Sequence, residues 1–296
     1  MKNKKQELTT GNYSTNNQAG GDLTVTNNYE GKSYDEIKAI SLDVFKENFY
    51  KLSKQAQGKV NERAEILIDR ILDKLKILEL TEEKLSQKIS NPDVQYALIN
   101  AQKQYARSGE DSSLEMLTEL LVQRFSANED SLKKIVINEA IEVMTKITPD
   151  QINNLTLLFL VKSCKLANVN ILFDLIYELY EKFGNYTEKS IDFYEHLQYT
   201  GLLTNDIFTT NHQPLGYLMS KDYPEDLDKH VANVVYKDLD MKVREVFDDR
   251  SYYVFKSWNE SKIQDYSLTS VGKVIAISNF NNLFNAKLNL SIWIKN

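Results

Sequence analysis

Cysteine, proline and glycine are scarce in this 296-residue chain, which contains one, four and ten of them. The single cysteine, Cys164, excludes an intramolecular disulfide framework and a cysteine-rich zinc site. It lies in the apolar run LTLLFLVKSC, so we expect a small buried residue there rather than a nucleophile. Four of the ten glycines fall between residues 11 and 31, which leaves the rest of the chain glycine-poor.

Long apolar runs and an excess of positive charge are also absent. The longest apolar run, residues 157–161, is far shorter than a membrane span. The N-terminal MKNKKQELTT lacks the apolar core of a signal peptide, so we expect a cytoplasmic protein. The net charge of −6 argues against the whole chain as a nucleic-acid-binding surface, because such binding neutralises phosphates with Lys and Arg.

The sequence contains no Walker loop and no G-x-G-x-x-G, H-E-x-x-H, C-x-x-C or G-x-S-x-G motif. The remaining candidate ligands for a divalent ion are histidines and acidic pairs: His196, His212, His230, Asp226, Asp228, Asp238, Asp240, Asp248 and Asp249. The histidines are widely separated, and acids within an acidic stretch are usually solvated. We therefore expect no enzyme activity, no cofactor and no metal site.

The tract from Gly11 to Gly31, whose only charged residues are Asp22 and Glu30, nearly repeats itself after ten residues. GNYSTNNQ aligns with GDLTVTNN, so that glycine matches glycine, Ser matches Thr, and Asn17 matches Asn27. Gly-Asn and Gly-Asp favour turns, and LTVT has the alternation of a short strand. The pattern predicts a β-repeat segment over residues 1–33, with a flexible polar tail as the alternative. Two such units cannot bury a core alone, so neighbouring subunits would supply the missing ones.

Residues 34–80 contain no proline and one glycine, and they carry a regular apolar stripe. Its spacing of about 3.7 residues predicts one long amphipathic helix, roughly 65 Å in length. We expect this helix to lie across the later helices or to pair with its own copies. The residues predicted to mediate oligomerisation come from the tract and from this helix: Tyr13, Asn17, Leu23, Val25, Asn27, Phe45, Phe49, Leu52, Leu67 and Ile71.

The remaining sequence predicts an α-helical domain over residues 81–148 and an α+β part over residues 149–296, so the chain is mainly α. Helices are expected at residues 94–107, 113–125, 131–147, 152–164, 171–183 and 187–201. Thr148 and Pro149 have the residue types of a helix start. After Gly201, short strands are expected near residues 202–203, 266–268 and 288–294, and a helix at residues 271–283.

The order of these last elements resembles a winged helix. Three helices precede Gly201-Leu202-Leu203, and Tyr266–Thr269 would be the returning wing strand after an insertion at residues 205–265. The helix in the recognition position, TEKSIDFYEHLQYTG, carries three acidic residues against a single lysine. Such a face would repel a polyanion. Contact with a protein is therefore expected, and a winged-helix nucleic-acid-binding regulator is the alternative.

Two constellations within roughly residues 91–296 resemble the Abi-alpha family of bacterial abortive-infection proteins. The first combines a helix led by Asn91-Pro92, the turn Gly109-Glu110-Asp111-Ser112, a helix with Leu120-Leu121, and Ile147-Thr148-Pro149-Asp150. Ile147 stands where that pattern has leucine. The second is Leu268-Thr269-x-x-Gly272-Lys273, similar to the LT-x-x-G that closes members of that family. The N-terminal tract resembles short β segments that head other uncharacterised bacterial proteins.

This resemblance implies a role in phage defence, and no activity follows from it. Together with the tract, it predicts a non-enzymatic, self-assembling protein of bacterial anti-phage defence. The protein would oligomerise through residues 1–33 and the long helix, and it would contact a phage or host protein through its C-terminal part.

Overall fold

The computed structural model describes residues 33–48, 54–78, 81–127, 132–183, 189–205, 215–223 and 248–294. The predicted β-repeat segment, apart from Ser33, lies outside the described residues, as does most of the predicted insertion at residues 205–265. The β-repeat therefore stays a prediction.

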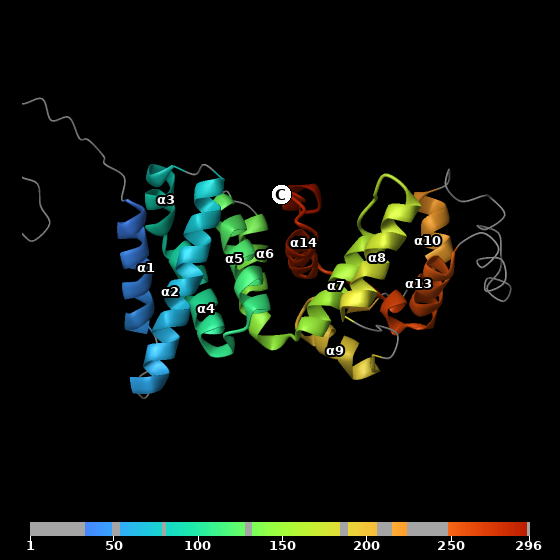
Figure 1. Ribbon diagram of the computed structural model, residues 1–296, viewed down its shortest axis with the longest axis horizontal. Helices are drawn as coiled ribbons and strands as arrows, with labels where there is room; N and C mark the ends of the chain where they lie inside the picture. The colour runs from blue at the N-terminus through green and yellow to red at the C-terminus, as the bar shows by residue number, and fades with distance from the viewer. Residues whose placement is uncertain are drawn as a thin grey trace, which may run out of the picture.

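The described residues are mainly helical, as the sequence predicts (Figure 1). The first group of helices comprises α1 (Tyr34–Asn48), α2 (Lys54–Ile77), α3 (Glu82–Ile89), α4 (Pro92–Ser108), α5 (Asp111–Ser126) and α6 (Leu132–Val143). The next elements are η1 (Met144–Lys146), α7 (Pro149–Lys162), α8 (Val169–Phe183), α9 (Ile191–Tyr199), β1 (Leu203–Asn205) and α10 (Leu215–Asp222). The chain continues with α13 (Asp249–Glu260), η2 (Lys262–Asp265), β2 (Tyr266–Leu268), α14 (Ser270–Phe284) and η3 (Leu290–Ile292). None of the described helices is long and apolar enough to span a membrane.

Two of the three strands expected after Gly201 are present, and they pair with each other. β1 and β2 form a two-stranded antiparallel sheet with Leu203 opposite Leu268. The strand expected at residues 288–294 is wrong, because this stretch contains the 3-10 helix η3. There the side chain of Asn289 accepts a hydrogen bond from the Ser291 N–H at 3.0 Å, a local bond that competes with strand pairing. The indole of Trp293 donates to the Ser163 carbonyl at 2.9 Å and anchors this end of the chain to α7.

The prediction of one long helix over residues 34–80 is wrong, since α1 and α2 pack side by side (Figure 1). Lys38 of α1 forms ion pairs with Glu65 and Asp69 of α2 at 3.0 and 2.8 Å. In one continuous helix, Lys38 and Asp69 would be about 45 Å apart. Hydrogen bonds from Lys38 to Asp69 and Glu65 also raise the pKa of its amine. The apolar stripe keeps its spacing in both helices, so periodicity alone does not reveal that the chain reverses.

Three residues of the predicted oligomerisation set are buried within their own chain. Leu67 and Ile71 belong to the main hydrophobic core, and Phe45 packs in a smaller cluster with Val60 and Ala106. In this fold, the apolar stripe of α1 and α2 is covered by the neighbouring helices of the same chain. The other seven members of the set lie outside the described residues: Tyr13, Asn17, Leu23, Val25, Asn27, Phe49 and Leu52.

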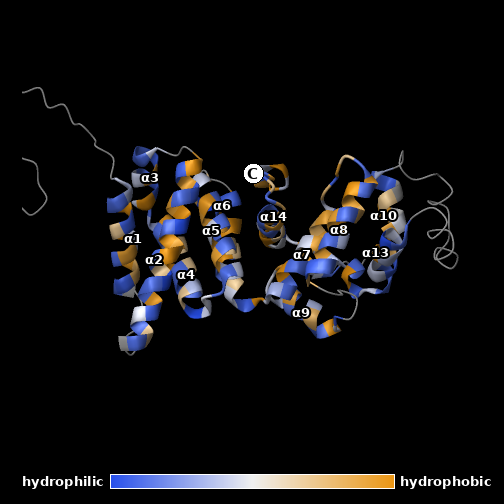
Figure 2. Ribbon diagram, in the orientation of Figure 1, coloured by the Kyte–Doolittle hydropathy of each residue, from blue (hydrophilic) through white to orange (hydrophobic). Residues whose placement is uncertain are grey.

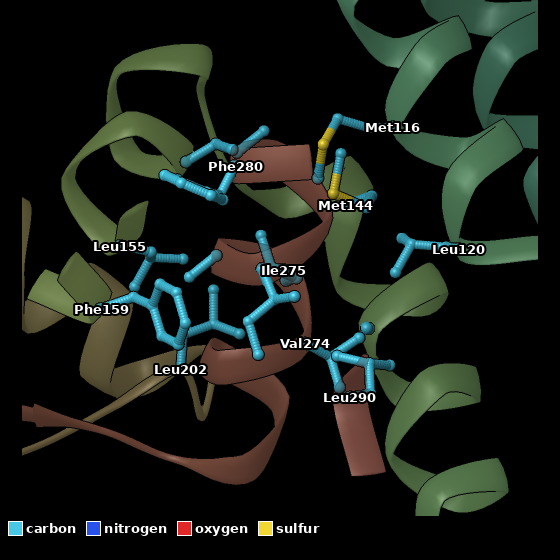
Figure 3. Packing of buried hydrophobic residues seen from close by; sticks show 14 of the residues in the cluster. Met116, Leu120, Met144, Leu155, Phe159, Leu202, Val274, Ile275, Phe280 and Leu290 are labelled. Atoms are coloured by element: carbon cyan, nitrogen blue, oxygen red, sulfur yellow. The ribbon is translucent and has the colours of Figure 1, made fainter. Parts of the chain in front are cut away.

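Helix α14 joins the two parts of the chain. It packs against α5, α6 and α7, and its buried residues surround most of its circumference. Figure 3 shows Ile275 of α14 lying between Phe159 of α7 and Leu120 of α5. Figure 2 shows hydrophobic residues along α5, α7 and α14. One hydrophobic core therefore extends across the boundary predicted at residues 148 and 149.

Two residues of the LT-x-x-G sequence fix the start of α14. The Thr269 hydroxyl accepts a hydrogen bond from the Gly272 N–H at 3.1 Å, and the Thr269 N–H donates to the Leu202 carbonyl at 3.1 Å. Gly272 lies so close to Leu202 that a Cβ at this position would overlap the Leu202 carbonyl oxygen. This part of the sequence pattern thus has a physical basis, because it lets the backbone of α14 approach the turn that precedes β1.

Replacing Gly272 with alanine should therefore destabilise the protein by about 1–3 kcal/mol, because the new methyl group must displace backbone. The matched control is Gly58→Ala on α2, where nothing lies within 4 Å of the added Cβ. Gly58→Ala should instead stabilise by about 0.5–1 kcal/mol, because alanine favours the helix. Urea unfolding followed by circular dichroism measures both changes. Equal effects of the two substitutions would contradict the close approach of α14 to Leu202.

Candidate functional site

A cleft of about 420 Å³ opens where the turn after α4 meets the turn before α7. Its lining comes from the end of α4, the start of α5, and the segment that joins α6 to α7: Gln104, Arg107, Ser108, Glu110, Ser113, Leu117, Met144, Thr145, Ile147, Thr148 and Pro149. Two stretches named in the sequence analysis, residues 109–112 and 147–150, therefore border one site.

Gly109 and Arg63 make the sharp turn between α4 and α5. Gly109 adopts a left-handed conformation with φ of 64° and caps the end of α4. Arg63 of α2 donates hydrogen bonds to the carbonyls of Ala106 and Arg107 at 2.8 and 3.3 Å. A Cβ on residue 109 would overlap the Arg63 guanidinium. Glycine at this position thus lets α4 and α5 be joined by only two residues, Gly109 and Glu110.

The opposite wall of the cleft is the capped start of α7. The Thr148 hydroxyl accepts from the Gln151 N–H at 3.3 Å, and Gln151 Oε1 accepts from the Thr148 N–H at 3.0 Å. Gln151 Nε2 also donates to the Phe193 carbonyl at 3.2 Å and lies 3.0 Å from His196 Nδ1, which must accept because an amide nitrogen only donates. The helix start predicted at Thr148 and Pro149 is confirmed, and α9 holds it in place.

The floor of the cleft is apolar and contains one buried amide. Leu117 and Met144 are buried, and Ile147 is half-buried. Gln104 is only 8% exposed, and its Nε2 donates to the Ile141 carbonyl. The cleft therefore has a largely apolar wall, and the Gln104 amide beside it is tied to α6.

Hydrogen-bond donors lie at the mouth of the cleft. The N-cap residue of α5, Glu110, makes no side-chain cap, so the first N–H groups of α5 have no capping acceptor. The Arg107 guanidinium forms no ion pair with a carboxylate of the described residues. The half-buried Ser113 also lines this region. The polar groups that border the cleft are therefore mainly donors.

A second polar cluster, at the start of α4, holds helices together. The Arg124 side chain is fully buried and donates to Asp93 Oδ2 at 2.7 Å and to Asn138 Oδ1 at 3.1 Å. Asn138 in turn donates to Asp93 Oδ1 at 3.0 Å. Desolvation raises the pKa of Asp93, but the hydrogen bonds from Arg124 and Asn138 outweigh it, so the pKa lies below its ordinary value. This cluster joins α4, α5 and α6 and is structural.

We expect Asp93→Asn to cost about 2 kcal/mol of stability at neutral pH, because it leaves the buried Arg124 charge without its carboxylate. The value is below that of a fully buried pair because the Asp93 side chain is 38% exposed. Asp73→Asn, which removes an exposed pair with Lys76, should change stability by less than about 0.5 kcal/mol. Urea unfolding at neutral pH compares the two.

The same cluster predicts a pH dependence. The pKa of Asp93 is lower in the folded protein than in the unfolded chain, where it is about 3.9. The ionised carboxylate therefore stabilises the fold fully above the unfolded pKa, and this stabilisation is lost as the pH falls through the folded pKa. The difference in stability between the natural protein and Asp93→Asn should therefore shrink below about pH 4. A difference that stays constant across this range would contradict the assignment of the Asp93 carboxylate as the charged partner of Arg124.

The candidate metal ligands and Cys164 lie apart from the cleft or serve other roles. Asp248 caps α13 by accepting from the Ser251 N–H at 2.9 Å, and this bond lowers its pKa. Asp249 is exposed in the first turn of α13. Cys164 is buried, and burial raises the pKa of its thiol. The described residues contain no cluster of metal-ligating side chains, and the other candidates lie outside them: His212, His230, Asp226, Asp228, Asp238 and Asp240.

The sequence indicates both turns that border the cleft, but it does not indicate that the two turns lie next to each other in the fold. Nothing in the residue pattern links Gln104 and Arg107 to Thr148, because the contact depends on how α5, α6 and α14 pack. Gln104 gave no signal, since a single glutamine in a helix is ordinary.

One protein-family model, whose description names no activity, matches residues 31–252 and 232–294. The match covers most of the chain, so the chain belongs to this family. No curated protein and no solved structure matches the chain significantly.

Proposed function

We propose that this member of the family is a non-enzymatic, self-assembling protein of bacterial anti-phage defence that acts in the cytoplasm. The defence role rests on the resemblance of residues 91–296 to Abi-alpha proteins. The observation that carries the assembly role is the ten-residue repeat in the N-terminal tract, whose two units are too few to bury a core.

The packing of α1 and α2 leaves the N-terminal tract as the proposed assembly surface. Phe45, Leu67 and Ile71 are buried against their own chain, so they are not free to bind a second copy in this fold. Assembly then falls to residues 1–33, in which Leu23 and Val25 are the apolar positions of the best strand pattern. The low charge of the tract supports stacking, because stacked copies place like charges next to each other and residues 11–31 carry only Asp22 and Glu30.

The C-terminal part would serve as the contact with a partner. The pairing of β1 with β2 after α9 is consistent with a winged-helix-like arrangement, and the same observation supports the alternative of a nucleic-acid-binding regulator. Two features of α9 favour a protein partner. Asp192 and Glu195 are exposed on it, whereas Lys189, just before it, is paired with Asp150 at 2.7 Å. A nucleic-acid binder would show affinity that falls steeply with salt.

The double substitution Leu23→Asp/Val25→Asp should convert an oligomer into a monomer, because it places like charges in every stacked unit. Light scattering at micromolar concentration measures the mass. The matched control is Ile191→Asp, which changes a residue that is 57% exposed at the first position of α9, where a carboxylate is favourable. It should keep the oligomer. A monomeric natural chain at this concentration would refute the assembly proposal.

The defence role predicts that bacteria expressing the natural chain form fewer phage plaques than bacteria expressing Leu23→Asp/Val25→Asp at the same protein level. The matched control here is Asp73→Asn on α2, an exposed residue outside both the tract and α9, which should protect as the natural chain does. The efficiency of plaquing over a panel of phages measures the effect. Equal plaquing with the natural and the doubly substituted chain, across phages that infect this host, would count against a defence role that needs assembly.

A further inference from the structure

We propose that the exposed face of α9 binds a cationic amphipathic helix of a partner protein. The inference rests on the proposed role of the C-terminal part as the contact with a protein, and it names the chemistry of that partner. The face consists of Ile191, Asp192, Glu195 and Tyr199, all of which are exposed, and is called the α9 face below. Helix α9 lies at the lower edge of the molecule in Figure 1.

Three residues of the α9 face form one row along the helix. Ile191, Glu195 and Tyr199 follow one another at intervals of four residues, so their side chains lie above one another on the helix surface. Rows of this kind pack into the grooves between the side chains of a second helix. The row is about 12 Å long, which corresponds to roughly two turns of a partner helix.

Both ends of this row are apolar and accessible to solvent. Tyr199 is 87% exposed and Ile191 is 57% exposed. A single exposed apolar residue is ordinary on a protein surface, but these two lie on the same helix face with carboxylates between them. Tyrosine is enriched among the residues that contribute most to binding at protein interfaces. A partner with an apolar stripe would cover both side chains.

The opposite face of α9 holds the helix in a fixed position. Tyr194 and Leu197 are fully buried, and the Tyr194 ring stacks on Tyr266 with 5.2 Å between the ring centroids. The Tyr194 hydroxyl also lies 3.2 Å from the Ser261 hydroxyl. The exposed row takes no part in these contacts, so the α9 face is formed before a partner arrives and loses little freedom when it binds one.

The two carboxylates make the α9 face negative, and η2 adds a third acid nearby. Burial raises the pKa of the Tyr266 hydroxyl, and the carboxylates of Glu195 and Asp265 raise it further, so both charges act on the same ring. Lys189, which precedes the helix, is paired with Asp150 at 2.7 Å. A face of this kind attracts lysine and arginine on a partner and repels a polyanion.

A cationic amphipathic helix matches the shape, the apolar ends and the charge of the α9 face. Its apolar residues recur every three or four positions, so they reach both Ile191 and Tyr199. Basic residues beside that stripe lie close to Asp192 and Glu195. A basic segment without apolar residues would match the charge alone, and duplex nucleic acid would match none of the three features.

Fluorescence anisotropy of a labelled helical peptide of leucine and lysine, titrated with the full chain, tests the proposal. We expect saturable binding at micromolar concentration. A peptide of the same composition in scrambled order lacks the apolar stripe, and a leucine–glutamate peptide of the same pattern has the wrong charge. Each should bind at least about tenfold more weakly. Equal binding of the three peptides, or no binding of the leucine–lysine peptide, would overturn the proposal.

Tyr199→Ser and the double substitution Asp192→Asn/Glu195→Gln should each weaken binding of the leucine–lysine peptide by about tenfold or more. The first removes the largest apolar contact, and the second removes the charges that attract lysine. Both leave the fold intact, because the three side chains are exposed.

The matched controls remove the same groups from other helices. Tyr96→Ser changes a tyrosine of α4 that is 55% exposed, and Asp43→Asn/Glu47→Gln removes two exposed carboxylates of α1. Both controls should bind the peptide as the natural chain does. Equal losses in the controls and in the α9 variants would show unspecific attraction to an acidic protein and would overturn the proposal.

Three outcomes separate this inference from the proposed function. A natural chain that is monomeric in light scattering but binds the peptide through α9 would refute assembly and support this inference. An oligomeric chain whose α9 variants bind the peptide as the natural chain does would refute this inference alone. Duplex DNA that binds the natural chain and displaces the peptide would favour the nucleic-acid-binding regulator and overturn the protein partner.

Discussion

The approach of α14 to the turn before β1 is the contact on which the rest of the structure depends. Thr269 and Gly272 bring the backbone of α14 against Leu202, and from there the helix runs between α7 on one side and α5 and α6 on the other. Each of these neighbours buries an apolar face against it. Because α14 is one of the last helices in the sequence, the core is completed by contacts between residues more than 100 positions apart, such as Asn279 with Asn153. Such long-range contacts slow folding relative to a simple helical bundle.

The polar residues inside this core specify how α14 lies on α7. Asn279 donates to Asn153 at 3.1 Å and to the Thr156 hydroxyl at 2.8 Å, and Thr156 donates to the Ile152 carbonyl at 3.1 Å. Apolar packing alone would allow α14 to rotate or slide with little change in buried area. Satisfied hydrogen bonds restrict it to one arrangement, because any shift would leave buried donors unpaired. Because α14 is buried around most of its circumference, this restriction decides which of its faces meets α7.

Local chemistry in the sequence predicted much of the fold, while long-range packing was not predictable. The start of α7 followed from Thr148 and Pro149, and the β1–β2 strands followed from short apolar runs beside Gly201 and Thr269. The reversal between α1 and α2 was missed because a stripe of constant period fits one helix or two. The 3-10 helix at Leu290 was missed because a side-chain bond from Asn289 replaced the strand that the alternation favoured. The turns that border the cleft were recognisable, but their meeting depends on α14, whose position no local pattern encodes.

The polar groups at the two ends of α4 differ in what they contribute to the structure. At the start of α4, Asp93 and Asn138 surround the buried Arg124, and every group in the network has a partner. At the end of the same helix, Gln104 donates to the Ile141 carbonyl of α6, and Arg107 is exposed beside the cleft. The Asp93 network therefore secures the packing of α4, α5 and α6, because its charges are out of reach of water and depend on each other. An exposed guanidinium is hydrated and makes no comparable contribution.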